Sequence, residues 1–172
     1  MKTIKSILKK TGWVLLIAFV VIQFFRPEKN ISTAVQPKNI STAVYVPAPV
    51  DTILRTSCYD CHSNNTVYPW YSYVQPFAWW LGDHVNEGKG EINFDDFASY
   101  RLRRQFHKIE EIEEMVVENE MPLSSYTLIH RDAVLSDDQK KLLTGWCHAV
   151  MDTMKAHYPE DSLKRPAPAR LP

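Results

Sequence analysis

The 172-residue sequence lacks three features: strand-like alternation, a net charge and a long apolar run. No stretch alternates convincingly between apolar and polar residues, so no β-sheet is expected. The 20 basic and 20 acidic residues leave no net charge. The apolar run at residues 13–25, broken only by Gln23, is short for a membrane span. As a helix it would reach about 20 Å, against about 30 Å of hydrocarbon in a bilayer.

The charge that is present is unevenly placed. Lys2, Lys5, Lys9 and Lys10 precede the apolar run, and residues 1–29 carry a net charge of +5, which leaves −5 for the remainder. Basic residues ahead of an apolar segment predict export of the chain that follows. No small residues after the run suit a signal peptidase, so residues 1–28 are predicted to be an uncleaved signal anchor, with a cleaved signal as the alternative. A mildly acidic exported domain gives no reason to expect nucleic acid as a partner.

The rest of the chain divides into three parts. Residues 29–49 contain the sequence KNISTAV twice, at 29–35 and 38–44, and are predicted to form a spacer. Residues 50–158 are predicted to form one domain, and the proline-rich residues 159–172 a disordered tail. These boundaries predict a single-pass protein of the inner membrane whose C-terminal domain lies in the periplasm.

The domain is predicted to be mainly α-helical, with long loops. Helices are expected over residues 51–62, over 70–87 with Pro76 as a kink or break, and over 95–119 as one helix or two. Ser136 and Gln139 form a capping-box pattern that starts a helix running to about His157, before Pro159. Its inner face is predicted to comprise Leu142, Leu143, Trp146, Val150 and Met154.

The most informative motif is SCYDCHSNN, at residues 57–65. Cys58, Cys61 and His62 form the C-x-x-C-H pattern of c-type haem attachment. Each thiol adds across one haem vinyl group, and the histidine beside the second sulfur reaches the iron as its proximal ligand. This chemistry is available outside the cytoplasm, in agreement with the predicted export.

Other interpretations of the two cysteines have specific requirements. A redox dithiol would need a βαβ setting, which the sequence does not show. A zinc site would need two more ligands, which Cys147 and His148 could supply. A disulfide between Cys58 and Cys61 would close a very small loop and stabilise little. Cys147 itself is expected to be a small buried residue of the last helix.

Two longer stretches, residues 57–94 and 118–143, are similar to the bacterial haem-binding domain family. The similarity extends over about residues 46–154 and excludes the doubled spacer and the tail. Members are small exported or membrane-tethered domains with one C-x-x-C-H site. The resemblance therefore implies one covalently bound haem c, held by Cys58, Cys61 and His62, and implies no particular electron partner. A small cytochrome c-like helical fold is expected.

The second axial ligand has several candidates. Met121 is preferred because it precedes Pro122 in a loop, where its backbone is extended and its thioether is accessible. The resemblance supports it, and the alternative is that Met121 only fills core space. His84 is the rival, since Phe77, Trp80 and His84 share a helix face that could lie over the porphyrin. His130 is third, and its alternative role is to hold the Met121 loop in place.

The sequence contains two further clusters with predicted roles. The aromatic cluster is expected to be core and also a wall of the haem pocket; it comprises Trp70, Tyr71, Tyr73, Phe77, Trp79 and Trp80. The acidic run is expected to be a solvated helix face, or more weakly a docking patch for a basic partner; it comprises Glu110, Glu111, Glu113, Glu114, Glu118 and Glu120.

The main functional prediction is a membrane-tethered monohaem cytochrome that transfers one electron to and from an unidentified partner protein. Without Met121 as ligand, an open site could instead reduce peroxide, with His84 or Glu87 as the acid–base group. A third hypothesis is a haem-based sensor that signals through its anchor. A tethered scaffold with a disulfide and no haem is the fourth.

Overall fold

The structure, a computed structural model that describes residues 2–164, is built from helices. No strand occurs within that range, so the prediction of a mainly α-helical chain is confirmed. The elements in chain order are α1 (Lys2–Ile22), η1 (Ile40–Thr42), α2 (Ala48–Ser57), α3 (Tyr59–His62), η2 (Trp70–Tyr73), α4 (Phe77–Glu91), η3 (Phe97–Ser99), α5 (Leu102–Val117), α6 (Ser124–Thr127), η4 (Arg131–Ala133), α7 (Asp137–His157) and α8 (Glu160–Leu163).

The long helix α7 begins and ends where the sequence predicts. The Ser136 hydroxyl accepts the Gln139 N–H, and the Gln139 side chain accepts the Ser136 N–H, which completes the capping box. The helix ends at His157, before Pro159. Four of the five residues predicted for its inner face are buried, but Leu142 is 44% exposed, and Cys147 and Met151 occupy the buried face instead.

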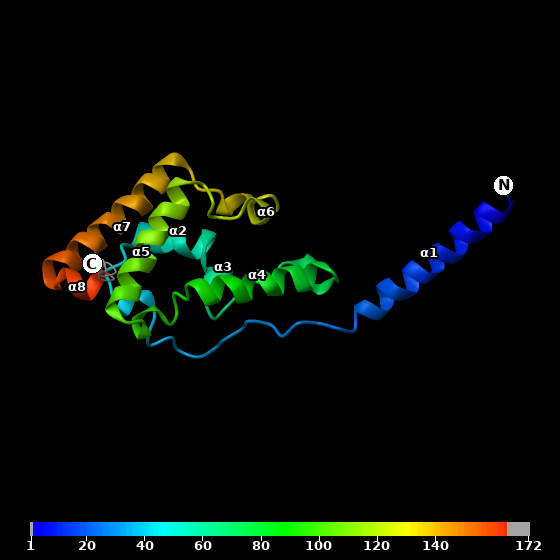
Figure 1. Ribbon diagram of the computed structural model, residues 1–172, viewed down its shortest axis with the longest axis horizontal. Helices are drawn as coiled ribbons and strands as arrows, with labels where there is room; N and C mark the ends of the chain where they lie inside the picture. Colours follow the sequence, from blue (N-terminus) through cyan, green and yellow to red (C-terminus); the bar gives the residue numbers. More distant parts are fainter. Residues whose placement is uncertain (1, 165–172) are drawn as a thin grey trace, which may run out of the picture.

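The main core lies where α5 and α7 pack side by side (Figure 1), with α2 and α8 against them. Phe106, Ile109 and Val116 form the buried stripe of α5, and Leu143, Trp146, Cys147 and Val150 belong to that of α7. Cys147 is fully buried, as predicted. A second, smaller core under α4 contains Tyr71, Leu81 and Val85.

Residues 29–49 do not form the free spacer that the sequence suggested. Ile40 is 1% exposed and belongs to the main core. The side chain of Asn39 donates to Asp95 and Tyr59, and that of Asn30 donates to Thr66 and to the Ser63 carbonyl. The asparagine of each KNISTAV copy thus binds that copy to the domain. Polar groups near the C-x-x-C-H segment need hydrogen-bond partners, and the two asparagines supply them.

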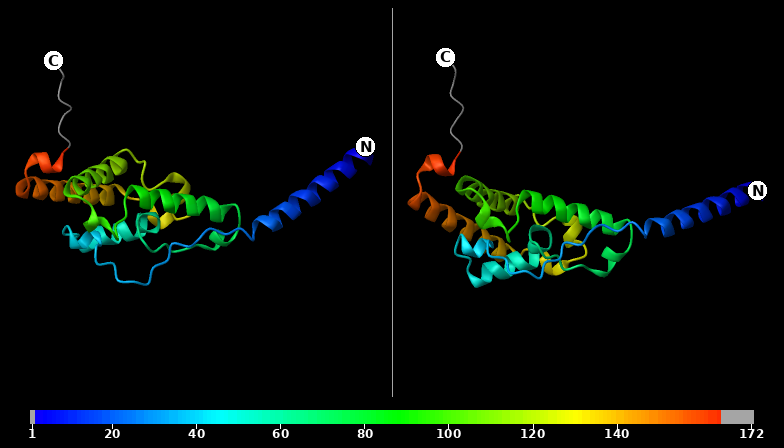
Figure 2. Two further views of the ribbon diagram at one scale, coloured as in Figure 1. Left: turned by 60° about the horizontal axis from the view of Figure 1, so that its bottom comes forward. Right: turned by 90° about the horizontal axis from the view of Figure 1, so that it is seen from below.

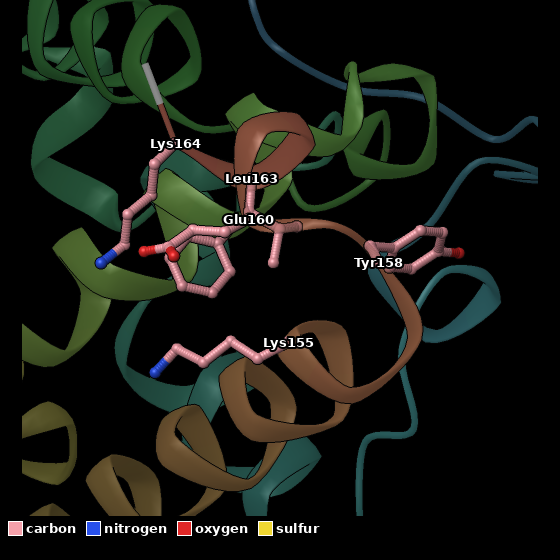
Figure 3. Close-up of a pocket in the computed structure, with 6 residues that line it drawn as sticks. Lys155, Tyr158, Glu160, Leu163 and Lys164 are labelled. Atoms are coloured by element: carbon pink, nitrogen blue, oxygen red, sulfur yellow. The ribbon is translucent and has the colours of Figure 1, made fainter. Parts of the chain in front are cut away.

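The prediction of a disordered tail is wrong for residues 160–163, which form a helix. Helix α8 follows Pro159, and Leu163 is 2% exposed within the main core. A hollow of about 260 Å³ separates the end of α7 from α8, with Lys155 and Lys164 at its edge (Figure 3). None of the predicted haem ligands lines this hollow. Residues 165–172 lie outside the described range.

Helix α1 leaves the domain at the end where α4 begins, in both views of Figure 2. Its large apolar side chains are exposed, including Trp13, Leu16 and Phe19. Within residues 2–164, no helix combines the length and the apolar character needed to cross a bilayer. The membrane anchor therefore stays a prediction.

Candidate functional site

A cavity of about 800 Å³ opens beside the C-x-x-C-H segment. One wall comes from the end of α2, from α3 and from α4, and the other from α5, the segment 118–123 and α6. Its volume lies within the range of roughly 300–1,000 Å³ usual for cofactor sites. Cys58, Cys61, His62, His84 and Met121 all line it. The cavity therefore brings every first- and second-choice ligand of the sequence prediction together.

The local fold of the motif explains how it faces the cavity. Helix α2 ends at Ser57, and Cys58 has a non-helical backbone before the short helix α3 begins. The Cys58 carbonyl accepts the N–H groups of Cys61 and His62, at 3.2 and 3.0 Å. One helical turn thus separates the two sulfurs, with the imidazole directly after the second. This is the arrangement that two vinyl groups and one axial ligand require.

His62 is oriented by the backbone of α4. Its Nδ1 lies 2.8 Å from the Gly88 carbonyl oxygen and 3.1 Å from that of Ile92. Carbonyl oxygens only accept, so Nδ1 carries the proton and donates it, which leaves the lone pair on Nε2. Burial lowers the pKa of His62 below its ordinary value and favours the neutral imidazole. A neutral ring with Nδ1 fixed by a carbonyl is the form that binds a metal through Nε2.

Gly88 is required at this contact. A Cβ at position 88 would lie 2.9 Å from the Cys61 carbonyl oxygen and 3.1 Å from the Cys61 Cβ. Only a glycine lets α4 approach α3 this closely. The same residue therefore sets the spacing between the two helices and supplies the carbonyl that orients His62.

The thiols themselves do not resemble a redox pair. Both are free in the structure. Burial raises the pKa of Cys58 to about 12 and that of Cys61 to about 11. A catalytic dithiol needs a lowered pKa, because the thiolate is the nucleophile. Within residues 2–164, no three His, Cys, Asp or Glu side chains are placed to hold a metal ion, so the zinc interpretation has no ligand set there.

Met121 reaches the cavity through a well-defined helix end. Asn119 adopts a positive φ of 61° just after α5. Its N–H bonds to the Val116 carbonyl, and the Glu120 N–H bonds to the Met115 carbonyl. These two bonds form a Schellman motif, which turns the chain sharply. The next residue, Met121, is thereby placed in the wall that faces α3 and α4.

Sequence reasoning missed one thioether in that wall. Met115, on α5, lines the cavity as Met121 does. It lies six residues before Met121, and its carbonyl also accepts the Met121 N–H at 3.1 Å. The helical spacing of Met115, three residues after the partly buried Ile112, was the available signal, but in a sequence that spacing is typical of any core residue.

The rival histidines occupy different places. The Nδ1 of His84 lies 2.9 Å from the Trp80 carbonyl, so its Nε2 is free while the residue lines the cavity. His130 is not part of the lining. Its Nε2 lies 2.9 Å from the Tyr71 hydroxyl, and its ring stacks on Tyr126. His130 thus holds the segment after Met121, which was the second role considered for it.

A hydrogen bond joins the two walls. The Tyr126 hydroxyl of α6 donates to Asp60 Oδ2 at 2.7 Å, and the Val67 N–H donates to Asp60 Oδ1 at 3.0 Å. Burial and this carboxylate raise the pKa of Tyr126. Asp60 lies between Cys58 and Cys61 in the motif, so the segment that carries Met121 is fastened to the motif itself.

Two sequence interpretations need correction. The predicted aromatic wall is wrong, because none of the six aromatic residues assigned to it lines the cavity, whose aromatic side chains are Phe94 and Tyr126. The acidic run is not wholly a solvated face, since Glu111 and Glu114 line the cavity. Glu111 pairs there with the buried Lys108, which also contacts Glu91 at 3.0 Å.

Comparison with protein families gives one result. The model of the haem-binding domain family matches residues 17–149, more than three quarters of the chain. The chain belongs to the haem-binding domain family. This haem-binding domain includes the doubled KNISTAV segment, which sequence reasoning had placed outside it, and the packing of Asn30 and Ile40 agrees with that wider boundary. Comparison with curated proteins and with solved structures gave no match.

Proposed function

We propose that this haem-binding domain carries one covalently attached haem c and transfers single electrons. The observation that supports this most directly is the shared cavity, which collects both motif thiols, an oriented His62 and Met121. Its volume and its lining accept a large flat cofactor. When bound, haem supplies an iron that takes up and releases one electron.

The cysteines hold the cofactor. Addition of each S–H across one vinyl group would place sulfur on one carbon and hydrogen on the other, with no oxidant consumed. His62 and Met121 are proposed as the axial ligands, one from each wall of the cavity. Two protein ligands leave no coordination position for a substrate, which favours electron transfer over catalysis.

The domain is proposed to be tethered to the inner membrane and to face the periplasm. The exposed apolar side chains of α1 support this, because a folded chain in water rarely exposes such a helix without a partner. The basic residues before this segment give the orientation. Thioether formation then takes place in the compartment where the attachment machinery operates.

Covalent attachment is tested by producing the protein in cells that contain this machinery and extracting it with acidified organic solvent. The pyridine haemochrome spectrum is expected to show haem retained on the polypeptide. The double variant Cys58→Ala, Cys61→Ala is expected to lose it, whereas Cys147→Ala keeps it, since Cys147 lies outside the cavity lining. Complete removal of colour from the parent protein would overturn the proposal.

A peroxidase-like enzyme is the second candidate, favoured by the free Nε2 of His84 beside Glu87 in the lining. The rate of carbon monoxide binding to the reduced protein distinguishes the electron carrier from the enzyme. With Met121 bound to iron, the reduced parent reacts slowly, while Met121→Ala reacts rapidly and completely. The matched variant Met115→Ala removes a thioether from the same cavity and is expected to behave like the parent. Rapid reaction of the parent would favour the enzyme.

A further inference from the structure

A long uncharged segment follows the haem-attachment motif. Residues 63–82 contain no Asp, Glu, Lys, Arg or His, although 23% of the whole chain is Asp, Glu, Lys or Arg. At that frequency, four or five charged residues would be expected among twenty. The segment is nevertheless not simply buried core, because it contains some of the most exposed aromatic side chains of the domain.

Four residues of this segment form what we call the aromatic surface: Trp70, Tyr73, Phe77 and Trp79. Their exposed fractions are 80%, 49%, 54% and 37%, respectively. They lie on η2 and on the first turn of α4, which pack together. None of them lines the haem cavity. The haem site therefore does not explain why they are aromatic.

The aromatic surface lies where α1 joins the domain. The Trp79 Nε1–H donates to the Phe25 carbonyl at 2.8 Å. The buried Gln75 donates to the same carbonyl at 2.7 Å, and its N–H donates to Gln23 Oε1 at 2.9 Å. The ammonium group of Lys29 lies 3.7 Å from the ring centroid of Tyr73. The segment that directly follows α1 is thus hydrogen-bonded to the aromatic surface. In both views of Figure 2, α1 leaves the domain beside the start of α4.

We propose that the aromatic surface rests in the headgroup region of the phospholipid bilayer into which α1 inserts. Trp and Tyr prefer this region because their rings are apolar and their N–H or O–H groups are polar. Absence of charge in residues 63–82 avoids the cost of burying an ion at this depth. Arg26 and Lys29, beside the surface, can reach lipid phosphates. Because the aromatic surface adjoins the segment that follows α1, a lipid partner is favoured over a protein partner.

The inference rests on the proposed membrane anchor, and one measurement tests both. The full-length holoprotein is reconstituted into vesicles of phosphatidylcholine and phosphatidylglycerol, with and without bromine on the acyl chains near the headgroups. Bromine quenches tryptophan fluorescence at short range. The ratio of tryptophan emission in brominated vesicles to that in unbrominated vesicles, taken at equal haem content, cancels the quenching by haem. Single Trp→Phe variants assign the quenching to each position.

Four of the five tryptophans have a defined role in this measurement. Trp13, in α1, reports insertion of the anchor, and Trp146, 6% exposed in the core, is the unquenched control. Quenching of Trp70 and Trp79 supports the proposal. If Trp13 is quenched but Trp70 and Trp79 are not, the anchor is correct and the inference is overturned. If Trp13 is not quenched either, the anchor proposal itself fails.

A charge variant provides a second test. Phe77→Glu places a carboxylate in the aromatic surface and is expected to abolish the quenching of Trp79 while that of Trp13 persists. The matched variant Tyr45→Glu changes an 82% exposed ring at a residue whose backbone carbonyl accepts the Trp146 Nε1–H, and is expected to leave both unchanged. Protection of Trp70 from a water-soluble quencher without quenching by brominated lipid would mean that a protein or a second copy covers the surface, and would overturn a lipid partner.

Discussion

Replacing Gly88 by alanine tests whether the close contact between α3 and α4 holds the haem site. The new Cβ would lie 2.9 Å from the Cys61 carbonyl oxygen, whereas ordinary contacts begin near 3.4 Å. The nearest atoms are the Cys61 carbonyl group and Cβ, which cannot rotate away, so α4 has to move by about half an ångström or more. Inserting a methyl group into a packed site typically costs about 1–3 kcal/mol.

Gly90 provides the matched control in the same helix. A Cβ there meets no atom within 4 Å. Both substitutions gain about 1 kcal/mol in helix propensity, since alanine replaces glycine in each. The difference between Gly88→Ala and Gly90→Ala therefore isolates the packing cost, and Gly88→Ala is expected to be less stable by about 1–3 kcal/mol.

The assay is urea unfolding of the holoprotein, followed by far-ultraviolet circular dichroism. The visible spectrum adds a local readout, because a displaced Gly88 carbonyl loosens its hydrogen bond to His62 and weakens the orientation of the imidazole. Gly88→Ala is expected to change this spectrum and Gly90→Ala to leave it as in the parent. Equal stability and equal spectra for the two variants would refute the role assigned to Gly88.

Three further predictions concern the surroundings of the site. Tyr126→Phe removes the hydrogen bond to Asp60 and is expected to lower the free energy of unfolding by about 1–3 kcal/mol, whereas Tyr45→Phe, in an exposed ring, changes it by less than about 0.5 kcal/mol. Burial raises the pKa of Cys147 from 9.0 to about 12, so the unfolded chain loses this proton first as the pH rises. Between those values the free energy of unfolding is expected to fall by about 1.4 kcal/mol per pH unit from this thiol, and denaturant titrations of Cys147→Ala should lack that part of the slope. At Asn119, valine should cost about 1–2 kcal/mol more than glycine in thermal or urea unfolding, because φ is positive there; equal effects would argue against the Schellman motif.

The sequence predicted which candidate ligands line the cavity better than it predicted their surroundings. Cys58, Cys61 and His62 could be found because attachment chemistry fixes their spacing within one helical turn. Met121 could be found because proline follows it. The structure places all four in one cavity, and their roles as ligands stay predictions.

Other features depend on contacts between distant segments, which local patterns do not encode. Gly88 looks like an ordinary helix glycine until α3 is placed against it. The aromatic cluster was assigned to the haem pocket because its composition suits either a core or a cofactor wall, and composition does not distinguish these from an exposed surface. The spacer interpretation was wrong because Ile40 and Asn39 find partners more than fifty residues away, in Phe94 and Asp95.

Under the proposed function, the length of α4 affects the distance over which electrons are transferred. Its first turn carries Phe77 and Trp79, and its last turns carry Gly88, which orients His62. Eleven residues of rise place these two points about 16 Å apart along the axis. Under the proposed function, α4 therefore sets the distance between the membrane-anchored end of the domain and its haem site. Lengthening α4 by one turn would carry the centre about 5 Å further away and, because tunnelling falls steeply with distance, would slow exchange with any partner embedded beside the anchor.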